Sequence, residues 1–325
     1  MLIAAAALAA PSASQPSPEP DPAFSFRAGL WLHLHHFLYV LGRAEAGLPD
    51  AGRRAVASAP ADQQQGLARM TKDEQSTWRA AVSAYAQGPS RLDATFDEAA
   101  WRATAALAPL GEDDGAGVAG IPADQLAALE RAAPIYRRVW WPAHGRASRT
   151  YIDDLQTWLR LDGEAILATV TRAFGKPWPA AGYPANVSAY ANWAGAYSTG
   201  DRLLVISSLD PGLAGSQGLE TLVHEAMHQW DDATAARLLA AARRQGVTPV
   251  PDTLSHALVF YTAGEAVRRS LPAHVPYAEA NGLWLRGGFA PLKGALDRYW
   301  RPYLNGRTSL EAALDGVLAA LKAPR

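Results

Sequence analysis

The chain has 325 residues, with 30 Lys and Arg against 31 Asp and Glu and a formal net charge of −1. This balance provides no basic surplus for nucleic acid, and no segment is long and apolar enough to span a membrane. The absence of cysteine excludes disulfides and thiolate ligands, so a metal site in this chain would use His, Asp or Glu. The length suffices for one large or two modest domains.

The first residues resemble a targeting segment. Residues 1–13 are apolar and end in small side chains, as in the core of a secretory signal, although the basic start of such signals is missing. We expect a secreted or periplasmic protein; otherwise the chain is cytoplasmic and the segment is an alanine-rich tail. Pro and Ser over 12–22 predict a disordered linker. The expected division is signal and linker over 1–22, a helical region over 23–180 and a metal-binding domain over 181–325.

An apolar stripe over residues 24–45 predicts the first helix of the helical region. His33, His35 and His36 lie in it, but at spacings of two and one they do not share a helical face. We interpret them as packing or polar-face histidines; the alternative is that His33 approaches an active site. Further helices are predicted after Thr71, after Pro122 and over residues 150–174. The first of these should begin with a capping box, because Thr71 opens the sequence Thr-Lys-Asp-Glu.

The second half opens with a predicted β-hairpin. Residues 187–197 alternate between apolar and polar side chains, residues 198–201 form a turn, and residues 202–208 form a second, antiparallel strand. A helix with a buried face should follow, because five apolar side chains recur there at helical spacing: Leu219, Leu222, Val223, Ala226 and Trp230.

This helix carries the sequence His-Glu-x-x-His. His224 and His228 are four residues apart and therefore lie on the same side of the helix, where two imidazoles can bind one tetrahedral zinc ion. Glu225 is next to the first of them and can take a proton from a metal-bound water without binding the metal. The plain alternative is an ordinary helix with two partly exposed histidines.

The motif and the strands before it resemble zincin-type zinc metallopeptidases over residues 185–280. A metzincin would have glycine at position 231 and histidine at position 234, where this chain has Asp231 and Thr234. A gluzincin takes its third ligand from a glutamate on a second helix, and the resemblance implies Glu265, on a helix predicted over 253–270. His256 is the alternative on the same helix. Because the two are nine residues apart they face opposite ways, so only one can join the site.

The resemblance also implies a hydrogen-bond donor for the oxyanion beyond the third ligand. Tyr277 is the first candidate and His274 the second, in a Pro-rich loop. Asp231 or Asp232 could orient a ligand imidazole, or both could belong to a solvated helix end.

We therefore expect a mainly α protein with a small β-sheet (α+β). It should have two lobes: a helical N-terminal region, followed by a zincin-like catalytic domain. The expected function is hydrolysis of peptide bonds in a peptide or protein substrate. Zn²⁺ would be held by His224, His228 and Glu265, with Glu225 as general base. The alternatives are a zincin-like module that binds metal without cleaving, and a helical protein with an accidental motif.

Overall fold

The computed structural model describes residues 23–49, 54–199 and 203–322. The predicted signal and linker over 1–22 lie outside the described residues. Among these, the chain is mainly helical with one four-stranded mixed sheet, which confirms the α+β class. No described helix is long and apolar enough to cross a membrane.

Seven helices precede most of the sheet in the described chain: α1 (Leu30–Glu45), α2 (Arg54–Ala57), α3 (Ala59–Leu67), α4 (Lys72–Gln87), α5 (Glu98–Leu107), α6 (Ala123–Val139) and α7 (Trp141–Phe174). The others follow it: α8 (Ser216–Met227), α9 (Asp231–Gln245), α10 (Leu254–Ser270), α11 (Tyr277–Ala280), α12 (Leu292–Ala295), α13 (Arg301–Leu304) and α14 (Leu310–Ala320). The predicted capping box begins α4, where Thr71 and Glu74 bond to each other's backbone N–H.

The sheet has the order β1-β2-β4-β3, with strands β1 (Phe24–Arg27), β2 (Tyr183–Ser188), β3 (Ala196–Thr199) and β4 (Leu203–Ser207). Strand β1 pairs with β2 in parallel, and its Phe24 ring packs against Trp178 and Tyr183. The prediction of one helix over 24–45 is therefore wrong at its start. Backbone pairing and aromatic contacts from residues far along the chain hold the first four residues extended.

The predicted hairpin is correct only at its end. Strands β3 and β4 are antiparallel, but β2 pairs with β4 in parallel, and residues 189–195 form a loop between β2 and β3. Two local features break the expected strand: the Asn192 side chain accepts a hydrogen bond from the Ala194 N–H, and Gly195 adopts a φ of +86°.

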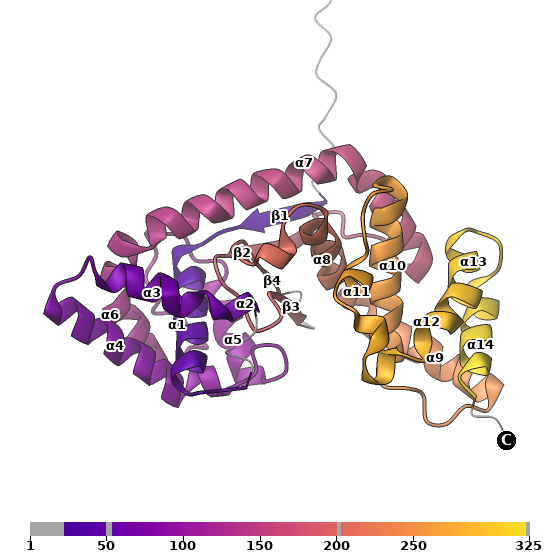
Figure 1. The fold of residues 1–325 in the computed structure, drawn as a ribbon, viewed down its shortest axis with the longest axis horizontal. Coiled ribbons are helices and arrows are strands. Elements are labelled where there is room, and N and C mark those ends of the chain that lie inside the picture. Colours follow the sequence, from indigo (N-terminus) through magenta and orange to yellow (C-terminus); the bar gives the residue numbers. More distant parts are fainter. Residues whose placement is uncertain (1–22, 50–53, 200–202, 323–325) are drawn as a thin grey trace, which may run out of the picture.

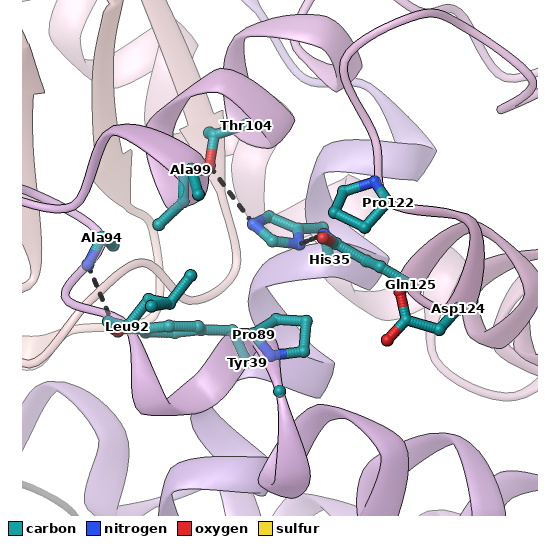
Figure 2. Close-up of a pocket in the computed structure, with 12 residues that line it drawn as sticks. His35, Tyr39, Pro89, Leu92, Ala94, Ala99, Thr104, Pro122, Asp124 and Gln125 are labelled. Atoms are coloured by element: carbon teal, nitrogen blue, oxygen red, sulfur yellow. Dashed lines mark hydrogen bonds between the residues drawn. The ribbon is translucent and has the colours of Figure 1, made fainter.

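The sheet separates two hydrophobic cores (Figure 1). Along β4, Leu204 and Ile206 face the C-terminal core, which α7–α10 and the last helices complete, whereas Leu203 and Val205 face the N-terminal core of α1–α6. The boundary between the cores thus follows the faces of the sheet, and both the 23–180 and the 181–325 regions contribute to each core. The N-terminal core contains a cavity beside α5 and α6 (Figure 2).

Candidate metal centre

The His-Glu-x-x-His sequence begins on the predicted helix, but this helix ends before the last histidine of the motif. The first four residues of the motif end α8, and His228 begins the single 3-10 turn that follows. The apolar residues of the motif region are buried in the C-terminal core, and this burial fixes the rotation of the helix about its axis. The ends of the His224 and His228 side chains therefore converge at one place.

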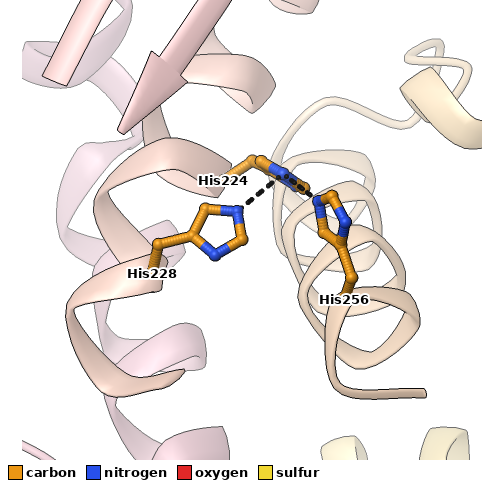
Figure 3. Close-up of side chains that lie close together, drawn as sticks. All are labelled: His224, His228 and His256. Atoms are coloured by element: carbon orange, nitrogen blue, oxygen red, sulfur yellow. Dashed lines mark hydrogen bonds between the residues drawn. The ribbon is translucent and has the colours of Figure 1, made fainter. Parts of the chain in front are cut away.

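A third histidine, His256 in the first turn of α10, completes a group with these two (Figure 3). The Nε2 atom of His224 lies 3.1 Å from Nε2 of His256 and 3.3 Å from Nε2 of His228. Ligand atoms of all three lie within 4.8 Å of one another. His224 is buried, His228 is partly exposed and His256 is exposed, so the group opens to solvent on one side.

The two separations from Nε2 of His224 are close to those between ligands of one small cation. Zinc binds imidazole nitrogen at about 2.0–2.1 Å, and a tetrahedral arrangement then places two such nitrogens about 3.3–3.4 Å apart. One N–H on His224 can satisfy only one of its two close contacts, whereas a cation between the rings satisfies all three nitrogens. Burial and the neighbouring histidines lower the pKa of His224 and His256, which keeps both imidazoles in the neutral form that binds metal.

Asp231 sets the tautomer of His228. The Nδ1 atom of His228 donates to Oδ2 of Asp231 over 2.8 Å, so its Nε2 carries a lone pair toward the other histidines. Although burial lowers the pKa of His228, the hydrogen bond to Asp231 and the charge of Glu225 raise it overall, which indicates a more basic ligand. Of the two aspartates considered from the sequence, the structure gives this orienting contact to Asp231.

Glu225 lies beside the group but is not one of its members. The carboxylate is buried, and its Oε2 accepts a hydrogen bond of 2.7 Å from the Ser198 hydroxyl on β3. Burial raises the pKa of Glu225, and the charge of His228 and the Ser198 bond offset part of this rise. The result is an oriented carboxylate with increased proton affinity, as a general base requires.

The structure does not bring Glu265, the predicted third ligand, into the histidine group. Its carboxylate instead forms an ion pair with Arg268, and Arg301 lies 3.8 Å away. His256 and Glu265 face opposite sides of α10, as their spacing of nine residues predicts. His256 faces α8, and Glu265 faces the two arginines. His256 therefore replaces Glu265 as the third member of the group.

The two candidate oxyanion donors have different surroundings. Both ring nitrogens of His274 contact α8: Nε2 lies 2.6 Å from the Glu220 carboxylate and Nδ1 lies 2.9 Å from the Ser216 hydroxyl. The Tyr277 ring stacks on Phe260, whose ring centroid is 4.1 Å from that of His224. Phe260 thus lies between Tyr277 and the histidine group, whereas His274 hydrogen-bonds to the first turns of α8.

Sequence reasoning missed two residues at this site. Ser198 lies in a stretch interpreted as a turn, and Phe260 is one of several apolar residues on α10; neither position carries a local signal. Comparison of the chain with family models, with curated proteins and with solved structures finds no match.

Proposed function

We propose that this protein is a zinc-dependent peptidase in which His224, His228 and His256 hold the metal. The observation that carries the proposal is the convergence of three histidines, with Nε2 of His224 at about the spacing of tetrahedral zinc ligands from each of the other two, beside a buried carboxylate that is not itself in the group. Three protein ligands leave one coordination position for water or substrate, which is typical of catalytic rather than structural zinc.

When bound, zinc would supply a water of lowered pKa and polarise the scissile carbonyl. The chain's own residues would then handle the protons and the substrate. Glu225 takes the proton of the attacking water and passes it to the leaving amine, and its raised pKa favours its taking the proton. Ser198 holds one carboxylate oxygen and so fixes the direction of the other.

The position of β3 supports a peptide as substrate. Strand β3 is at the edge of the sheet and brings Ser198 to Glu225. An extended peptide pairing with this edge by main-chain hydrogen bonds would pass beside the base. The Phe260 and Tyr277 rings beside His224 would contact an apolar side chain of such a peptide.

The test compares the full chain with three variants, each loaded with zinc and assayed on a mixed peptide library. We expect about one zinc per chain in the wild type, in Glu265→Gln and in Glu225→Gln, and loss of zinc in His256→Ala. Peptide cleavage should disappear in Glu225→Gln although zinc is retained, because only the base is removed.

Zinc retained by His256→Ala but lost from Glu265→Gln would overturn the ligand set. Cleavage by Glu225→Gln would overturn the mechanism. Stoichiometric zinc without cleavage by the wild type would instead support the non-cleaving metal-binding module considered from the sequence.

A further inference from the structure

A cavity of about 240 Å³ lies in the N-terminal core, remote in the sequence from the metal centre (Figure 2). Its walls come from α1, from α5, from the start of α6 and from the segment after α4, and they are mostly apolar, including Pro89, Leu92 and Ala99. Ala99 and Pro122 are exposed at the surface, so the cavity opens to solvent on this side.

The polar part of the wall is built around His35, which is 4% exposed. Its Nδ1 lies 3.3 Å from the Gln125 side-chain nitrogen, which can only donate, and 3.0 Å from the Tyr85 hydroxyl. Nδ1 is therefore an acceptor, and Nε2–H donates to the Thr104 hydroxyl over 3.2 Å. Burial lowers the pKa of His35 to about 4, so this ring is uncharged at neutral pH. The lining also contains the carboxylate of Asp124, which is exposed at the surface beside Pro122.

The Gln125 side chain leaves one acceptor unused. Its nitrogen is committed to His35, whereas its Oε1 has no hydrogen-bond partner among the described residues. The residue is only 5% exposed and lines the cavity. This oxygen is not one of the side-chain atoms that are fully buried without a partner, so it remains accessible from the cavity, where a ligand N–H or O–H can donate to it.

The volume sets the size of the ligand. A dry engineered cavity of about 150 Å³ binds benzene, so about 240 Å³ accommodates two fused rings. We propose that this cavity binds a small, uncharged, two-ring aromatic molecule that carries an N–H or O–H donor, with its rings against the apolar wall and its donor on Oε1 of Gln125. This proposal is independent of the metal centre.

The test titrates the full chain with indole and with benzofuran, a molecule of the same shape whose oxygen replaces the N–H, and follows binding by calorimetry. We expect saturable one-to-one binding of indole, and binding of benzofuran that is roughly five- to tenfold weaker because the hydrogen bond is lost. Ala99→Phe should block the cavity and abolish binding. Ala80→Phe, at an exposed alanine on α4 outside the cavity lining, is the matched control and should bind as the wild type does.

A second variant tests the polar contact separately. Gln125→Met keeps the length of the side chain but removes the acceptor, so indole and benzofuran should bind it with similar affinity. Circular dichroism and thermal melting establish that each variant is folded. Absence of saturable indole binding, or indole binding that Ala99→Phe leaves unchanged, would overturn the proposal; equal affinities for the two probes in the wild type would overturn the role of Gln125.

Discussion

The N-terminal core should be sensitive to acid because it buries histidines in their neutral form. His33, His35 and His36 on α1 are all 4% exposed or less, as the packing interpretation predicted. Burial lowers the pKa of His33 to about 3, that of His35 to about 4, and that of His36 well below its ordinary value. In the unfolded chain each histidine titrates near pH 6.5.

The direction in which stability changes with pH follows from the number of protons that the folded and unfolded chains bind. Below pH 6.5 the unfolded chain binds a proton at His33 that the folded chain does not bind until about pH 3. The free energy of unfolding therefore falls as the pH falls through this window, by roughly 1.4 kcal/mol per pH unit for each such histidine. Between pH 7.5 and 5.0, His33 alone should cost about 2 kcal/mol, a large part of the 5–15 kcal/mol stability of a typical domain.

The assay is urea unfolding of wild type and His33→Gln at several pH values between 7.5 and 5.0. Glutamine retains a polar group near the Ser148 hydroxyl, 2.8 Å from Nε2 of His33, but cannot titrate. We expect the variant to be less stable at pH 7.5 and to lose about 2 kcal/mol less than the wild type over the range. Ser148→Ala, which removes the same hydrogen bond from the other side, should lower stability without changing the pH slope. Parallel pH curves for wild type and His33→Gln would refute the reasoning.

Three further predictions concern the metal centre and its support. Asp231→Asn should weaken zinc binding about 10- to 100-fold, measured by competition with a chelator, because the carboxylate no longer fixes His228. Gly264→Ala should lower the free energy of unfolding by about 1–3 kcal/mol, measured by urea titration, because the new Cβ would lie 2.6 Å from a proline side chain in the loop before α11. Ser198→Ala removes a hydrogen bond that lowers the pKa of Glu225. The acid limb of the pH profile of kcat/KM should therefore shift to higher pH, by at most about one unit. An unchanged acid limb would argue against Glu225 as the base.

The sequence determined the parts of this protein that depend on neighbouring residues. Helical periodicity placed His224 and His228 on one side of a helix, because that relation needs only the 3.6-residue turn. The capping box at Thr71 was equally local, since its two hydrogen bonds join residues three apart.

Only the tertiary structure decided which residues meet across the chain. Helical geometry showed that either His256 or Glu265 could reach the site, but the choice depends on how α10 docks on α8 and on the arginines that pair with Glu265. Strand β1 likewise exists through its pairing with β2, about 160 residues away in the sequence. The contact of Ser198 with Glu225 needs both the sheet and α8 in place. Such contacts leave no periodic signal, because they arise from the packing of elements whose separation in the sequence is unrelated to their separation in space.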